Sequence, residues 1–158
     1  GYWKDVGTIP SLWEANMEVL DPEHSGINLF DEDWKIYSRN SGMPGHKICA
    51  GASVENSMIT DGCKIAGSVK HSILFAGVKV EAGAVVEDAV VMGKAGASVK
   101  HCIVAENVVI GENAVVGAMP TEDEQGVATI GPDVCVGTGA KIGPNAMISE
   151  DVKDGEEK

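Results

Sequence analysis

Apolar residues recur at every sixth position through the middle of the chain. The column consists of Leu74, Val80, Val86, Met92, Ser98, Val104, Ile110 and Val116. A second column of mostly small residues follows the first at a distance of four positions. It consists of Val78, Ala84, Val90, Gly96, Cys102, Val108 and Ala114. A helix repeats at about 3.6 residues and a strand at about 2, so neither explains this period. A hexad is typical of a short strand followed by a corner, with three faces closing one coil. We therefore expect a parallel β-helix with the first column inside.

Two further patterns support stacked coils. The six-residue register returns after a gap in Ile130, Val136, Ile142 and Ile148. Four similar phrases also begin at Val54, Val69, Val86 and Val99, at intervals of 15, 17 and 13 residues. Self-similarity of this kind indicates an array of repeats. Because the intervals are unequal, we expect shortened corners, and first coils that are less regular than the last.

The flanking segments predict fewer regular elements. Thr8 is expected to cap a helix with Pro10 in its first turn, and this helix carries two apolar stripes. One stripe contains Leu12, Ala15, Val19 and Leu20, and the other contains Trp13 and Met17. Residues 21–46 have the composition of a linker, and 118–128 form an excursion rich in charge and turn formers. The acidic segment 149–158 is expected to be frayed.

Composition narrows the class of protein further. The 158 residues contain 20 glycines and only 4% aromatic residues, which suits a narrow coil interior. A formal charge of −12, with Arg39 as the only arginine, argues against nucleic-acid binding, which needs clustered basic residues. The sequence contains no apolar run long enough to predict a membrane-spanning helix. We expect a reducing cytoplasm, because the sequence also shows no signal peptide. The cysteines are expected to be structural fillers, because Cys49, Cys63, Cys102 and Cys135 show no CxxC pair and no metal-ligand spacing.

Two segments in the N-terminal part of the chain resemble a known protein family. The run Gly1–Thr8 (GYWKDVGT), followed by Leu12–Asn16 (LWEAN), resembles the end of the catalytic domain of bacterial ADP-glucose pyrophosphorylases, also called glucose-1-phosphate adenylyltransferases. Leu29–Ser38 is similar to the bridge of that family into its C-terminal domain. The resemblance implies that residues 1–20 end a nucleotidyltransferase domain, that 21–46 are a linker, and that 47–158 form a left-handed parallel β-helix. Handedness is implied by the resemblance alone.

The resemblance also implies an activity for a longer parent protein. That family makes ADP-glucose and pyrophosphate from ATP and α-glucose 1-phosphate for glycogen synthesis, with Mg²⁺. Asp5 matches the aspartate that helps to hold the metal, and Tyr2 and Trp3 match positions near the sugar. The family's glycine-rich nucleotide loop, second metal aspartate and sugar-phosphate lysine have no counterpart here, so this chain alone is expected to be an inactive fragment. Its expected partners are a missing N-terminal catalytic domain, the other subunits of a homo- or hetero-tetramer, and a phosphorylated effector.

Two alternatives remain open from the sequence. One is a hexapeptide acyltransferase, in which a histidine acts as general base toward an acyl thioester. His71 and His101 are its only candidates, but their recurrence in equivalent phrases favours corner residues with a shared structural role. The other alternative is a non-catalytic regulatory paralogue, against which the intact segment Asp5–Thr8 argues.

Overall fold

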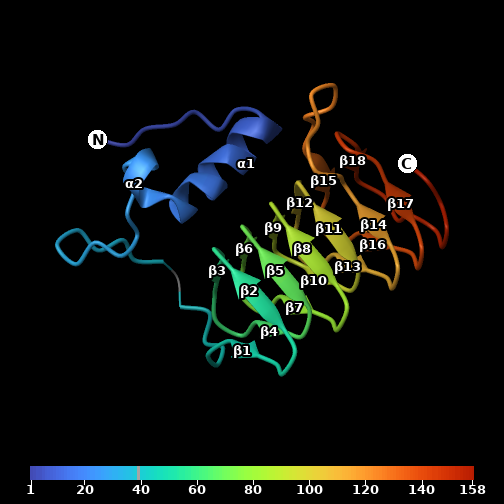
Figure 1. The fold of residues 1–158 in the computed structure, drawn as a ribbon, viewed down its shortest axis with the longest axis horizontal. Coiled ribbons are helices and arrows are strands. Elements are labelled where there is room, and N and C mark those ends of the chain that lie inside the picture. The colour runs from blue at the N-terminus through green and yellow to red at the C-terminus, as the bar shows by residue number, and fades with distance from the viewer. Residues whose placement is uncertain (39) are drawn as a thin grey trace.

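The computed structural model describes residues 1–38 and 40–158, and Arg39 lies outside the described residues. Strands β1 to β18 form three parallel sheets of six short strands each, stacked along one axis (Figure 1). The first sheet contains β1 (Lys47–Ile48), β4 (Lys64–Ile65), β7 (Lys79–Val80), β10 (Lys94–Ala95), β13 (Val109–Ile110) and β16 (Cys135–Val136). The second contains β2 (Ser53–Glu55), β5 (Ser68–Lys70), β8 (Val85–Glu87), β11 (Ser98–Lys100), β14 (Val115–Val116) and β17 (Lys141–Ile142). The third contains β3 (Met58–Ile59), β6 (Ile73–Leu74), β9 (Val90–Val91), β12 (Cys102–Val104), β15 (Ala128–Ile130) and β18 (Met147–Ile148). The expected parallel β-helix is confirmed.

The four repeated phrases set the register of the second sheet. Val54 pairs with Val69, Val69 with Val86, and Val86 with Val99, so each phrase contributes one strand at the same place in successive coils. From Val104 onward the inward residues follow the six-residue spacing on either side of the segment 117–127, which confirms that the last coils are the more regular ones.

The strict six-residue column is wrong between Val86 and Val104. The inward residues there are Val91, Ala95 and Val99, each fully buried, because the corners of this coil are shortened. Met92 and Ser98 are only half-buried and lie outside the main interior cluster. The small column slips in the same coil, where Ala89 and Ala97 enter the interior in place of Val90 and Gly96.

The C-terminal segment is not frayed, contrary to expectation. Val152 is buried and bridges Val136, and Glu157 bridges Lys141, so the chain continues the first two sheets for another part-coil. Backbone bonds join the two segments, with the N–H of Gly137 donating to the carbonyl of Val152 (2.8 Å) and that of Gly143 to the carbonyl of Lys158 (2.8 Å). Its acidic side chains stay at the surface while its backbone completes the coil.

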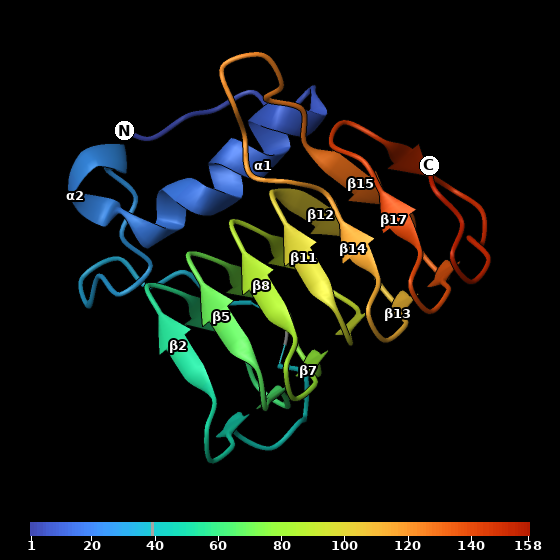
Figure 2. The same cartoon turned by 45° about the vertical axis from the view of Figure 1, so that its right-hand side comes forward.

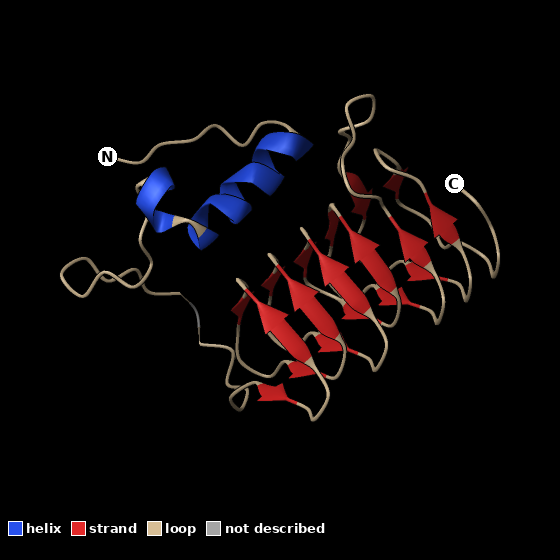
Figure 3. Ribbon diagram, viewed as in Figure 1, coloured by secondary structure: helices blue, strands red, loops and turns tan. Residues whose placement is uncertain are grey.

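Helix α1 (Ile9–Met17) lies along the corner between the second and third sheets, and a 3-10 turn η1 (Glu18–Leu20) and helix α2 (Pro22–Ser25) follow it (Figures 2 and 3). Helix α2 falls in the expected linker and begins at a proline, a favoured first helical residue. The segment 117–127 between β14 and β15 rises beside the start of α1 (Figure 2). Among the described residues, no helix has the length and apolar character needed to span a bilayer.

Candidate functional site

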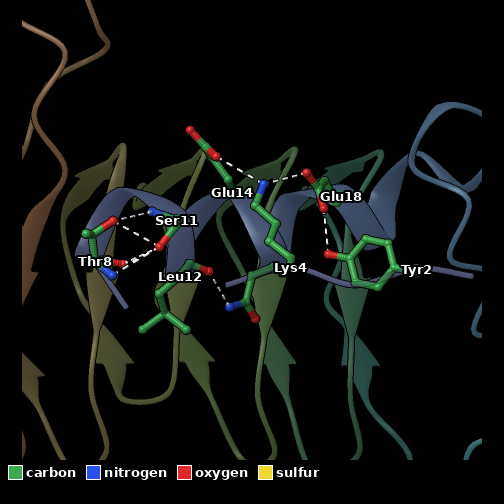
Figure 4. A network of polar contacts seen from close by, with 8 residues as sticks. Tyr2, Lys4, Thr8, Ser11, Leu12, Glu14 and Glu18 are labelled. Carbon is green, nitrogen blue, oxygen red and sulfur yellow. Dashed lines mark hydrogen bonds and ion pairs between the residues drawn. The ribbon is translucent and has the colours of Figure 1, made fainter. Parts of the chain in front are cut away.

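The N-terminal arm, residues 1–8, runs back along the outer face of α1 (Figure 4). Thr8 caps the helix as expected, because its Oγ1 accepts from the N–H of Ser11 (3.3 Å) and its own N–H donates to Ser11 Oγ (3.1 Å). Pro10 lies in the first turn, where the backbone N–H has no helical partner to lose. The cap fixes the point at which the arm reverses direction over the helix.

Lys4 fastens the arm to the helix. Its Nζ donates to Glu18 Oε1 (2.6 Å) and to Glu14 Oε2 (3.0 Å), and the Tyr2 hydroxyl donates to Glu18 Oε2 (2.6 Å). The hydrogen bond to Glu18, followed by the one to Glu14, raises the pKa of Lys4. The same contact with Lys4, followed by the one with Tyr2, lowers the pKa of Glu18. We name this set the Lys4 clamp: Tyr2, Lys4, Glu14 and Glu18.

The expected metal ligand, Asp5, lies on the exposed part of the arm. Its Oδ1 accepts the N–H of Gly7 (2.9 Å), which fixes the rotation of the carboxylate. A Cβ at Gly7 would lie 3.2 Å from this oxygen, so glycine permits the tight turn. No group of three or more metal-ligating side chains is present in the parts of the chain that the structure describes. Asp5 therefore fits Mg²⁺ only as one ligand, which suits an ion that keeps waters and substrate oxygens.

The two expected sugar-side residues are placed differently. Trp3 is 83% exposed, whereas the hydroxyl of Tyr2 turns to the helix and bonds Glu18. The resemblance put both side chains on the substrate side, but only Trp3 is free of the helix in this arrangement. Sequence reasoning missed the Lys4 clamp, although its signal was the pair of glutamates four residues apart on one helix face.

The inner face of α1 packs on the β-helix. Met17 is buried with the outward-facing side chains Val90 and Ile103, together with Val127 from the excursion. Trp13 adds a directional contact, because its Nε1 donates to the backbone carbonyl of Asp88 (2.7 Å). The stripe formed by Trp13 and Met17 contacts the coils, and Leu20 of the other stripe packs against the same cluster.

The two histidines occupy equivalent corners. His71 and His101 both have φ +43°, and the same corner holds Asn56 (+37°) in the preceding coil and Asp88 (+50°) in the coil between them. The expected shared structural role is confirmed. The ring of His71 contacts Asp88 through Nδ1 and Oδ1 (2.5 Å), while His101 is buried against Trp13 with ring centroids 4.5 Å apart.

A cavity of about 660 Å³ opens between α1 and the segment 117–127. It is lined by Pro10, Trp13, Glu14, His101, Pro120, Thr121, Glu122, Gln125 and Val127. These described lining residues include carboxylates but no lysine or arginine. The cavity wall from this chain therefore lacks the fixed positive charge that a phosphorylated ligand prefers.

Comparison with known proteins identifies the coils. The family described as GlmU-like, C-terminal hexapeptide matches residues 46–137, more than half of the chain. The chain belongs to this hexapeptide family.

Longer relatives of this hexapeptide chain share its sequence closely. Glucose-1-phosphate adenylyltransferases of Bacillus thuringiensis (strain Al Hakam) and Bacillus anthracis are each 55% identical over 106 residues. That of Bacillus mycoides (strain KBAB4) is 54% identical over 106 residues. Each match covers 67% of this chain but only 27% of the relative, in its C-terminal part. The family match begins at residue 46, so the arm and α1 lie outside it.

Proposed function

We propose that this chain is the C-terminal region of a glucose-1-phosphate adenylyltransferase, which transfers an adenylyl group from ATP to α-glucose 1-phosphate. The observation that carries the proposal is the 55% identity to proteins of that name over their C-terminal part. The segment Asp5–Thr8 and the hexapeptide coils support it in the same chain. The relatives favour this function over an acyltransferase, and His71 and His101 occupy equivalent corners with the same positive φ, which favours a structural role over that of a general base.

Within the whole enzyme, Asp5 is proposed to be one ligand of Mg²⁺, which would neutralise charge on the reacting phosphates. The exposed carboxylate keeps Oδ2 available, since Oδ1 is occupied by the N–H of Gly7. Trp3 provides an exposed aromatic face beside it, suited to one face of a sugar ring. Tyr2 is proposed to act through the arm, because its hydroxyl is engaged by Glu18.

The β-helix is proposed to serve assembly and regulation in a cytoplasmic tetramer with a phosphorylated effector. Because the cavity beside α1 has no cation among its described lining residues, the cationic part of an effector site would come from the catalytic domain or another subunit. The 158-residue chain carries one candidate metal carboxylate and is proposed to be inactive by itself.

The test uses the complete reading frame that contains this sequence. We expect the full protein to form ADP-glucose and pyrophosphate from ATP and glucose 1-phosphate with Mg²⁺, and the 158-residue chain to form neither. Asp5→Asn should lower the rate and raise the Mg²⁺ concentration needed for half-maximal rate, whereas Asp31→Asn in the linker should not. A full protein without this activity would refute the proposed function, and an unchanged Mg²⁺ titration in Asp5→Asn would remove Asp5 from the metal site.

A further inference from the structure

The contacts of the arm alternate along its length. Tyr2 and Lys4 bond the carboxylates of Glu14 on α1 and Glu18 at the start of η1, while Trp3 between them is largely exposed and Asp5 after them is exposed. In an extended segment, successive side chains point to opposite sides. Holding the second and fourth side chains on the helix therefore turns the third and fifth away from it. The direction of the Asp5 side chain therefore follows from the contacts that Tyr2 and Lys4 make with Glu18.

The clamp is itself attached to the β-helix. Glu14 follows Trp13, whose Nε1 bonds the Asp88 carbonyl, and Glu18 follows Met17, which is buried among the coils. The glutamates are four residues apart and share the outer face of the helix, as Figure 4 shows. One short helix thus carries coil contacts on its inner face and arm contacts on its outer face. The arm is therefore attached to the β-helix through α1.

The Lys4 clamp has more contacts than a single surface ion pair. Lys4 has only 22% of its side chain exposed and reaches two carboxylates, and Glu18 uses one oxygen for Lys4 and the other for Tyr2. Exposed single pairs contribute little, but several charges joined in one network hold a definite geometry. A lysine with a single partner would leave the arm free to swing about that contact. The second glutamate fixes its direction.

We propose that Lys4 and Tyr2 are positioning residues, which hold the arm on α1 so that Asp5 and Trp3 face away from the helix together. This rests on the proposed function, which assigns Asp5 to Mg²⁺ and Trp3 to the sugar side. The polar atoms of Lys4 and Tyr2 are engaged by Glu14 and Glu18. The two residues act through the backbone of the arm, and the Asp5–Gly7 hydrogen bond completes the orientation.

The first test measures the mobility of the arm in this 158-residue chain, without substrate or metal. Lys4→Met keeps the aliphatic stem and removes the charge. Backbone order parameters of residues 3–6 should fall from about 0.8 to below about 0.6 by nuclear magnetic resonance relaxation. Amide exchange at Gly7 should become about tenfold faster, because the open population rises when the network is lost. Lys4→Arg should restore both, since it keeps the charge and can bridge two carboxylates.

A matched control separates positioning from general stability. Lys79→Met removes a lysine that makes no ion pair with a described residue, on a coil remote from the arm, and should leave the arm unchanged. The melting temperature of Lys4→Met should stay within about 2 °C of the parent, because the β-helix core is untouched. Unchanged order parameters in Lys4→Met would overturn the proposal, and so would an equal loss in Lys79→Met.

A second test in the full-length protein distinguishes this proposal from the proposed function. Lys4→Met and Tyr2→Phe should lower kcat by about tenfold at saturating substrate, and Lys4→Arg should recover most of it. If the unmodified full protein has no adenylyltransferase activity, the proposed function fails whatever the arm does. If that protein is active and Lys4→Met loosens the arm without lowering kcat, positioning by the clamp is refuted while the proposed function stands.

Discussion

The shortened coil can be tested with two neighbouring residues. Val99 points into the interior of the second sheet and is fully buried, whereas Ser98 beside it faces outward and is half-buried. A strict six-residue column would place Ser98 inside instead. Aspartate substituted at each position therefore reports directly which residue faces the interior. We expect Val99→Asp to abolish stable folding and Ser98→Asp to be tolerated.

The expected loss in the free energy of unfolding of Val99→Asp follows from the burial of Val99. An aspartate there must be protonated or remain charged in an apolar coil, and a pKa raised by 3–5 units corresponds to about 4–7 kcal/mol. Loss of the valine side chain from the interior adds about 2 kcal/mol. The sum approaches the whole stability of a typical domain, roughly 5–15 kcal/mol. Ser98→Asp should change the free energy of unfolding by less than about 1 kcal/mol, because its side chain reaches solvent.

Urea unfolding followed by far-ultraviolet circular dichroism measures both variants. Val99→Asp should lack a cooperative transition or lower its midpoint severely, and Ser98→Asp should retain the parental curve. The structure would be contradicted by the reverse order, or by equal losses. Val99→Ala provides a milder variant with an expected cost of about 1–3 kcal/mol, which keeps the comparison measurable if Val99→Asp does not fold.

Three further outcomes are expected. Thiol labelling of the native chain should modify the exposed Cys135 quickly and Cys102 only after unfolding, because burial both covers Cys102 and raises the pKa of its thiol. The pKa of Glu157, lowered mainly by its hydrogen bond to Lys141, should return toward the ordinary value in Lys141→Met when the carboxyl is titrated by carbon-13 resonance. The lowered pKa means that this contact stabilises the last part-coil above the ordinary glutamate pKa and is lost as pH falls through the folded value. Trp13→Phe should lower the free energy of unfolding by about 1 kcal/mol through loss of the bond to the Asp88 carbonyl, measured in urea.

Much of the fold was predictable because the coil repeats its own signal. Phrases that begin at Val54, Val69, Val86 and Val99 stack in one sheet, so similarity between segments gave the correct register. Counting by six alone failed at Met92 and Ser98, where the apolar or small residue expected inside belongs to the outer surface. Met92 is apolar for a different reason, since it packs beside α1. The six-residue period alone cannot distinguish a side chain inside the coil from an outer side chain that a helix covers.

The tail and the site needed three-dimensional information. The charges of 149–158 suggested fraying, but backbone bonds to neighbouring strands do not depend on side-chain polarity. The roles assigned to Asp5 and Trp3 come from their motif and stay predictions, while the opposite placement of Tyr2 follows only from its bond to Glu18. The spacing of Glu14 and Glu18 predicted a shared helix face, yet nothing in the sequence says that the preceding arm folds back over it.

The stacked corner explains why two equivalent histidines differ. Nδ1 of His71 contacts Asp88 in the following coil, whereas after β14, the strand that pairs with β11, the chain leaves the coil in the segment 117–127. Nδ1 of His101 is accordingly buried without a hydrogen bond among the described residues. The packing of Trp13 against this ring offsets part of that cost, so α1 covers the corner at the point where the coil cannot satisfy its own histidine.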